Sequence, residues 1–300
     1  MTDSNAMTTR LIGELLGQDA PVRLAGDARV TRNCVDLSPD DDWLPGLTRI
    51  GDYRITALDD ADGSACYAGQ LWFGGEAAIC AIRVKARDGL MSECEIIRGP
   101  PRFPGETGVD ARTLTSPRPA FSQEVPPDRR LARHELIALA KGYYDAVNRE
   151  QPSLAPLDPN GARIEQGTQI TGNPAFRFEF YEGLDGQELP NFGCWTAREQ
   201  FERGLWNADT VPQVRFASVE PRTGVVCAFM TYRPWGKRPW VELEGAGRVG
   251  PIGGGERRVG LNAMEVFKID HGAILEMESV WSMEDGRFLN PWSAEMEAEG

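Results

Sequence analysis

Hydrophobic and polar residues alternate in the same way along two separate stretches of the chain. Met264–Trp281 reads as an apolar strand, a tight turn at His271-Gly272 and a second strand, and Ile82–Ile97 repeats this pattern around Asp88-Gly89. The glycine can take the positive φ that a two-residue hairpin turn requires. The two turns are offset by 183 residues (272 − 89). Two such hairpins predict two copies of one structural module.

A second pair of segments supports a duplication. Ala28–Asn33 aligns with Ala162–Gly167 at an offset of 134 residues (162 − 28). The difference between the two offsets, 49 residues (183 − 134), predicts an insertion in the second copy. That copy contains extra Gly/Pro-rich segments at Gly172–Gly193 and Arg233–Arg257. A chance resemblance between two β-hairpins is the alternative interpretation.

Turn residues and prolines divide the chain into segments. In residues 1–99, short apolar strands separated by turns such as Asp62-Gly63 predict a helix-poor module with a mostly antiparallel sheet. Prolines then become too frequent for a regular element, so residues 100–127 are predicted to be a linker. We expect a second module with insertions at 128–284 and an acidic tail at 285–300.

Asp128–Arg149 gives the clearest helical signal, because Leu136, Leu139, Tyr143 and Val147 follow the spacing of one buried stripe. A strand, a short helix and several long strands follow it. This order is typical of an α+β fold in which a curved antiparallel sheet forms a cone around a long helix and leaves a pocket at its open end. We therefore predict two tandem modules of this kind, with the long helix packed in the second.

Charge and cysteine usage exclude several function classes. The net charge of −13 and the pI of about 4.8 would repel nucleic acids and anionic membranes. No apolar run approaches the roughly 20 residues that span a bilayer, and the N-terminus lacks the basic leader of a secretory signal. The six cysteines show no CxxC spacing. We expect reduced thiols and a cytoplasmic protein.

The segment Arg163–Thr171 carries a family resemblance. It is similar to an R-x-E-N-G-x-x-T-T pattern found in a two-module branch of the nuclear-transport-factor-2-like superfamily, and it departs from the pattern at Gln166 and Ile170. The superfamily includes ketosteroid isomerase, scytalone dehydratase and SnoaL-type cyclases. The two-module branch includes the sphingomonad diarylpropane lyase, which removes formaldehyde from a lignin-derived dimer without a cofactor. The resemblance implies a cofactor-independent enzyme.

The residues themselves point to acid–base chemistry or to simple binding. The chain has no P-loop lysine, HExxH or GxSxG motif. With two histidines that lack nearby partners in the sequence, no metal site is expected. His134 on the long helix is a candidate proton carrier near neutral pH, and Tyr144 a candidate for holding a substrate oxygen. A partly solvated histidine and a core tyrosine are the alternatives.

Arg163 and Glu165 lie on the same face of their predicted strand, because side chains alternate with a period of two. Inside the cone they would form a buried ion pair, and Glu165 near apolar walls would have a raised pKa. Arg215 is a candidate for neutralising a phenolate or enolate, and Tyr53 is a candidate in the first module. A surface ion pair at the strand edge is the alternative for Arg163 and Glu165, and a solvated strand end is the alternative for Arg215.

Tryptophans are concentrated in the second module and its insertions, where they are suited to cover a pocket and stack on an aromatic ligand. The set is Trp195, Trp206, Trp235, Trp240 and Trp281, of which Trp195 and Trp281 are the predicted substrate-binding residues. The resemblance implies a lyase that dehydrates and deformylates a small lignin-derived phenolic dimer, and we expect a homo-oligomer. A non-catalytic binding or dimerisation module, and a dehydratase or isomerase on a polyketide- or steroid-like substrate, are the alternatives.

Overall fold

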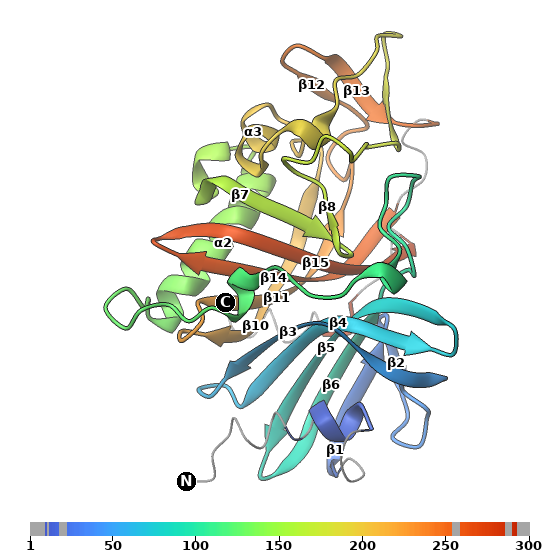
Figure 1. Ribbon diagram of the computed structural model, residues 1–300, viewed down its shortest axis with the longest axis vertical. Coiled ribbons are helices and arrows are strands. Elements are labelled where there is room, and N and C mark those ends of the chain that lie inside the picture. The colour runs from blue at the N-terminus through green and yellow to red at the C-terminus, as the bar shows by residue number, and fades with distance from the viewer. Residues whose placement is uncertain (1–9, 11, 18–22, 254–258, 286–289, 293–300) are drawn as a thin grey trace.

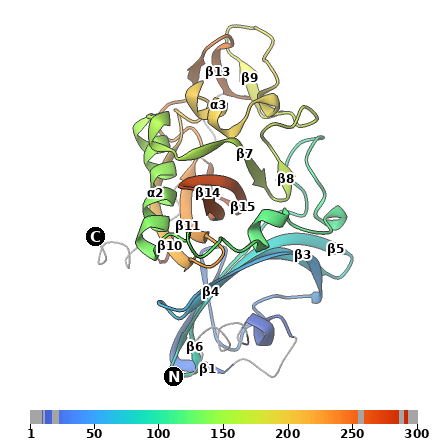
Figure 2. The same ribbon diagram turned by 60° about the vertical axis from the view of Figure 1, so that its left-hand side comes forward.

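Two curved six-stranded sheets dominate the computed structural model (Figures 1 and 2). The structure describes residues 10, 12–17, 23–253, 259–285 and 290–292, so most of the predicted acidic tail lies outside the described residues. The fold class is the predicted one, α+β with two tandem modules and a long helix packed in the second. No helix among the described residues combines the length and the apolar character needed to cross a membrane.

The first sheet has the strand order β2-β1-β6-β5-β4-β3. Its neighbouring strands are antiparallel, apart from the parallel pair β1 and β6. The strands are β1 Leu24–Arg32, β2 Val35–Leu37, β3 Leu47–Asp59, β4 Ser64–Phe73, β5 Glu76–Arg87 and β6 Leu90–Arg98.

The second sheet repeats this topology as β8-β7-β15-β14-β11-β10, with β7 and β15 as its parallel pair. Each strand therefore has a counterpart at the same place in the first sheet. The strands are β7 Leu157–Glu165, β8 Thr168–Gln169, β10 Thr210–Glu220, β11 Val225–Arg233, β14 Val259–Asp270 and β15 Ala273–Asp285.

The closing hairpins match residue by residue, as the sequence predicted. Asp88 and Gly89 have φ angles of 52° and 79°, and His271 and Gly272 have 52° and 73°. Both hairpins shift register at the same place, after Lys85 and after Lys268 (268 − 85 = 183). The offset of 183 residues is therefore confirmed.

The alignment of the opening hairpins was wrong by one residue. Thr31 pairs with Glu95 in the first sheet, and Ile164 pairs with Glu278 in the second, so the offset is 133 (164 − 31). Both turns begin with a non-glycine residue at positive φ, Asn33 in the first and Gln166 in the second. The sequence comparison had placed Asn33 on the glycine that follows Gln166, because it set Ala28-Arg29 on Ala162-Arg163.

The long helix α2 spans Arg133–Arg149 and begins five residues later than predicted. The Glu135 carboxylate accepts a hydrogen bond from the Ala132 N–H at 2.7 Å, and Glu150 ends the helix in a left-handed conformation. Its buried stripe packs on one face of the second sheet, which we call the inner face of that sheet. The shorter helices are α3 Ala197–Glu202 and the 3₁₀ turns η1 Ala111–Thr113, η2 Pro119–Ser122, η3 Pro152–Leu154 and η4 Phe192–Cys194.

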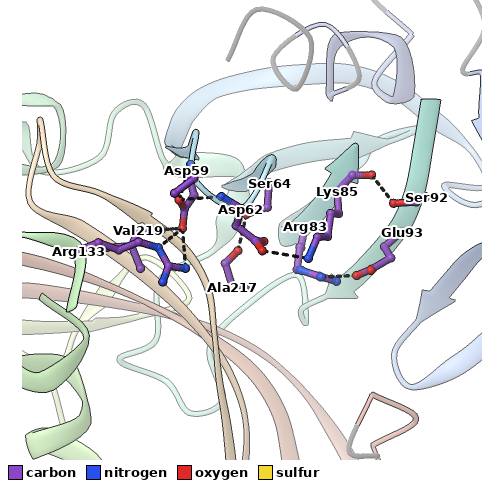
Figure 3. Close-up of polar contacts among 11 residues, drawn as sticks. Asp59, Asp62, Ser64, Arg83, Lys85, Ser92, Glu93, Arg133, Ala217 and Val219 are labelled. Carbon is purple, nitrogen blue, oxygen red and sulfur yellow. Dashed lines mark hydrogen bonds and ion pairs between the residues drawn. The ribbon is translucent and has the colours of Figure 1, made fainter. Parts of the chain in front are cut away.

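The opposite face of the second sheet packs against the first sheet. We call the two faces that meet in this contact the outer faces of their sheets. Figure 3 shows part of this interface. Asp59 in β3 accepts hydrogen bonds from the Val219 N–H at 3.0 Å and from the Arg133 side chain at 3.0 Å. The Ser64 hydroxyl donates to the Ala217 carbonyl at 2.7 Å. The first module therefore holds both β10 and the start of α2.

These contacts are exchanged reciprocally between the two modules. Glu220 accepts from the Leu58 N–H at 3.4 Å, and the Ser218 hydroxyl donates to the Ala57 carbonyl at 3.1 Å. Glu220 and Ser218 occupy the places in the second sheet that Asp59 and Ala57 occupy in the first. The modules therefore pack back to back with approximate two-fold symmetry.

The two predicted insertions pair with each other in a small third sheet of order β12-β13-β9. Strand β9, Tyr181–Gly183, comes from the first insertion. Strands β12, Val241–Leu243, and β13, Gly247–Pro251, come from the second. Figure 1 shows this sheet at the end of the molecule farthest from the first module.

Candidate functional site

A cavity of about 710 Å³ lies between the inner face of the second sheet and the two insertions. Aromatic side chains form much of its wall, among them Phe178, Tyr181, Trp206, Trp235 and Trp281. Phe178 and Tyr181 are stacked at 5.4 Å between ring centroids. A volume of this size is typical of sites for small organic molecules.

Two carboxyl groups lie in one row across the floor of the cavity. Glu165 in β7 pairs with Ser279 in β15, and Ser279 pairs with Glu265 in β14. Paired residues point to the same face of a sheet, so all three side chains face inward. With one strand between them, the Cα atoms of Glu165 and Glu265 are about 10 Å apart. Both carboxyl groups line the cavity.

Arg163 lies two residues before Glu165 on the same face, and it is only 4% exposed. Its Nη2 donates to Glu165 Oε1 at 2.9 Å, and its guanidinium lies 4.3 Å from the ring centroid of Trp206. Its Nε and Nη1 atoms are buried and have no hydrogen-bond partner among the described residues. Because buried donors are normally paired, these atoms are suited to bind an oxygen of a molecule in the cavity.

A third carboxyl group, Asp209, lines another part of the wall and is 3% exposed. It accepts hydrogen bonds from the Tyr232 hydroxyl and from the backbone N–H of Trp235, the latter at 2.8 Å. Tyr232 and Trp235 also line the cavity. Asp209 therefore holds the side chain of Tyr232 and the backbone of Trp235.

Burial changes the acidity of these groups because a charge is poorly solvated in an apolar cavity. It raises the pKa of Glu265 to about 7, although Arg163 acts to lower it. It raises the pKa of Asp209 to about 6, against the effect of the hydrogen bond from Tyr232. The pKa of Glu165 is also raised by burial, with Arg163 opposing the shift. A carboxyl group with a pKa near 7 can both give and take a proton at neutral pH.

Four of the predicted residues meet at this site. Arg163, Glu165 and Trp281 line the cavity, as the alternation along the strand and the position of the indole suggested. Tyr144 is buried on α2 next to Glu265, and its hydroxyl acts to lower the pKa of that carboxyl.

The other four predicted residues lie away from the cavity. His134 is exposed on the first turn of α2, because the helix begins only one residue before it. Tyr53 and Arg215 lie on outer faces, where the Tyr53 hydroxyl donates to Glu278 at 2.6 Å and Arg215 is paired with Glu95. Trp195 packs against Phe192 and under Arg203. The structure therefore does not support His134, Tyr53, Arg215 or Trp195 as residues of this cavity.

Sequence reasoning missed Glu265 and Asp209. Glu265 is flanked on its own face of β14 by Ala263 and Phe267, both fully buried. A single acidic residue between two apolar ones at a spacing of two is a signal that could have found it. Asp209 follows the short helix in a turn, and the sequence around it carries no comparable signal.

Metal-ligating residues do not gather in the part of the chain that the structure describes. No group of three or more His, Cys, Asp or Glu side chains there is placed to hold an ion. The site that can be built from the described residues is therefore one of carboxyl groups, an arginine and aromatic rings.

Solved structures with low similarity to the chain come from several bacteria. An LEH-like epoxide hydrolase of M. tuberculosis is 15% identical over 52% of this chain and 86% of its own, with a TM-score of 0.27. A proposed SnoaL-like polyketide cyclase of a Jannaschia species is 15% identical over 53% and 91%, with a TM-score of 0.25. An uncharacterised protein with a cystatin-like fold from Caulobacter vibrioides is 13% identical over 55% and 95%, with a TM-score of 0.27. At these TM-scores none of the three bears on the function of this chain.

A family relationship is found for the second module. No curated protein matches the chain. The family described as "Domain of unknown function (DUF8021)" matches residues 129–281, which are 153 (281 − 129 + 1) of the 300 residues and include the floor of the cavity. The chain therefore belongs to this family.

Proposed function

We propose that the cavity of the second module is the active site of a cofactor-independent enzyme that acts on a small aromatic molecule by acid–base chemistry. The observation that carries the proposal is the convergence of Arg163, Glu165 and Glu265 on one floor of a cavity whose wall is rich in aromatic side chains. A site that only binds an apolar ligand has no need of buried ionisable groups, which are costly to desolvate.

The finer proposal is a lyase on a phenolic dimer of the diarylpropane class. A carboxylate takes the phenolic proton, and Glu265 gives a proton to the benzylic hydroxyl, which leaves as water. The product of this step is a quinone methide. Glu265, which is now a carboxylate, then takes the proton of the terminal hydroxymethyl group, the adjacent carbon–carbon bond breaks, and formaldehyde leaves. The electron pair of that bond flows into the quinone methide and restores the phenolate.

Each residue has a distinct role in this scheme. Glu265 has the pKa of an acid that can be reprotonated near pH 7. Glu165 is the base that takes the phenolic proton, and Arg163 donates a hydrogen bond to its carboxylate at 2.9 Å. The free Nε and Nη1 of Arg163 stabilise the phenolate oxygen.

The test is an incubation of the protein with a panel of lignin-type phenolic dimers, followed by a formaldehyde assay and mass spectrometry of the products. We expect formaldehyde and an alkene product from at least one dimer. A product of unchanged mass would indicate an isomerase instead. Binding without any turnover across the panel would contradict the catalytic proposal and would favour a binding module.

A further inference from the structure

The wall of the cavity contains a tryptophan in a strained backbone conformation. Trp235 has a φ of 56°, in the left-handed region that is costly for a bulky residue. Residues 233–239 all line the cavity. Strain of this kind persists only where the surrounding structure enforces it, and such positions gather at ligand sites.

Contacts on both sides of Trp235 enforce this conformation. Asp209 accepts its backbone N–H at 2.8 Å, and the Lys237 N–H donates to the Ala208 carbonyl at 2.8 Å. The Lys237 ammonium group donates to the Val147 carbonyl at 2.6 Å, near the end of α2. The segment is therefore held by the helix and by the turn that contains Asp209.

Close packing prevents the segment from shifting. A Cβ atom on Gly236 would lie 2.4 Å from Thr210 Cγ2 and 3.0 Å from the Arg233 carbonyl oxygen. Gly236 thus fits only as glycine at this position. The backbone of Trp235, the preceding residue, is therefore held in place, and its indole projects from a fixed point on the wall of the cavity.

The ring of Trp235 is partly exposed and contacts one other aromatic ring among the described residues. That ring belongs to Tyr181, at 5.3 Å between centroids and an angle of 75°. An indole that is fixed in advance binds a flat aromatic ring with little loss of conformational entropy, and stacked or edge-on rings attract one another beyond simple burial.

We propose that Trp235 determines the specificity of the site by selecting a planar aromatic ring over a saturated ring of the same size, and that Asp209 is its positioning residue. This inference rests on the proposed function, since it requires that the cavity admit an aromatic molecule. It goes further by naming the side chain that recognises the ring and the carboxyl group that holds this side chain in place.

The test uses two probes with the same carbon skeleton and one hydroxyl group, the aromatic 2-naphthol and the saturated trans-decahydro-2-naphthol, with affinities measured by titration calorimetry. The variant is Trp235→Gly, because glycine accepts a positive φ and can keep the backbone of this segment unchanged. We expect the variant to lose about 3- to 10-fold more affinity for 2-naphthol than for the saturated probe. Trp240→Gly is the matched control, since Trp240 lies in the same insertion but outside the cavity lining. This control should keep the wild-type preference.

The role of Asp209 is tested by a pair of variants. Asp209→Asn keeps an oxygen that accepts the Trp235 N–H and should keep most of the preference for 2-naphthol. Asp209→Ala removes this accepting oxygen and should lose the preference for 2-naphthol to the same extent as Trp235→Gly. Equal retention in both variants would show that Asp209 does not position Trp235.

The possible failures can be told apart. Equal losses for the two probes in Trp235→Gly, or no loss at all, would overturn the specificity role of Trp235 and leave the proposed function standing. A wild-type protein that binds both probes equally would also overturn the specificity role of Trp235 and leave the proposed function standing. A wild-type protein that binds neither probe would overturn the proposed function and this inference together.

Discussion

The two modules share one topology, but their inner faces are built from different chemistry. In the second module the row across β7, β15 and β14 is Glu165, Ser279 and Glu265. The matching row in the first module is Arg32, Ile96 and Ile82, and Val30 stands in the place of Arg163. Ile96 and Ile82 are fully buried and pack in an apolar core with Trp43 and Leu44.

The connections between matching strands are short in the first module and long in the second. Residues 74–75 connect β4 and β5 in the first module, whereas residues 234–258 connect the matching strands β11 and β14 in the second. Residues 38–46 lie between β2 and β3, and residues 170–209 lie between the matching strands β8 and β10. The cavity thus occurs in the module where Arg163 and Glu265 replace inward apolar residues and where long loops build a wall. The first module serves as a platform for the second.

The largest expected effect separates the two faces of the second sheet. Glu265 on the inner face and Glu278 on the outer face are both fully buried, and burial raises the pKa of each to about 7. Glu265→Gln should lower kcat by about 10²- to 10⁴-fold, because it removes a proton donor. Steady-state kinetics on the substrate found in the dimer panel measures this effect.

Glu278→Gln is the matched control. Glu278 accepts hydrogen bonds from Tyr53 at 2.6 Å and from the Gly167 N–H at 2.9 Å, so it joins the modules and does not face the cavity. The kcat of the Glu278→Gln variant should stay within about threefold of the wild-type value, in line with a structural role of Glu278. Similar losses of kcat in the two variants would contradict the division of the sheet into a catalytic inner face and a structural outer face.

The second prediction concerns the ion pair that the first module lacks. Arg163→Met leaves Glu165 buried without its partner, so the free energy of unfolding should fall by about 3 kcal/mol. The double variant with Arg163→Met and Glu165→Leu should recover most of that loss, because it leaves no unpaired charge. Urea unfolding of both variants tests this prediction. A double variant as unstable as the single one would show that the pair stabilises the fold beyond compensating its own desolvation.

The third prediction is a dependence of stability on pH. The pKa of Glu265 is about 7 in the folded protein and close to 4.5 in the unfolded chain. The folded state therefore holds more protons between these values, and the free energy of unfolding falls as the pH rises from about 5 to 7. The contribution of one such group is at most about 1.4 kcal/mol for each pH unit. Unfolding curves at several pH values give the free energy of unfolding as a function of pH. The slope of this function between about pH 5 and 7 should be less steep by this amount in Glu265→Gln, and an unchanged slope would contradict the raised pKa.

Local patterns predicted the parts of the fold that local residues decide. The turns at Asp88-Gly89 and His271-Gly272 were found because glycine marks positive φ, and they define the register of both closing hairpins. The shared face of Arg163 and Glu165 followed from alternation alone. These features need only the sequence of one strand or one hairpin.

The remaining parts of the site depend on contacts between distant segments. The pattern within β14 marks Glu265 as an unusual acidic position, but which face of β14 points inward depends on its pairing with β15 and on the irregularity after Lys268. Arg215 and Tyr53 meet their partners only when the two modules dock. His134 was misplaced because helical periodicity gives the face of a residue but not the end of the helix that borders the cavity.

The most direct test of the account is a crystal structure of the Glu265→Gln variant with a bound phenolic dimer, since loss of the proton donor should let the substrate accumulate. We expect the dimer in the cavity of the second module, with a ring against Trp235 and an oxygen within hydrogen-bonding distance of Arg163. A dimer bound at the first module or between the modules, with the cavity of the second module left without ligand, would contradict the account.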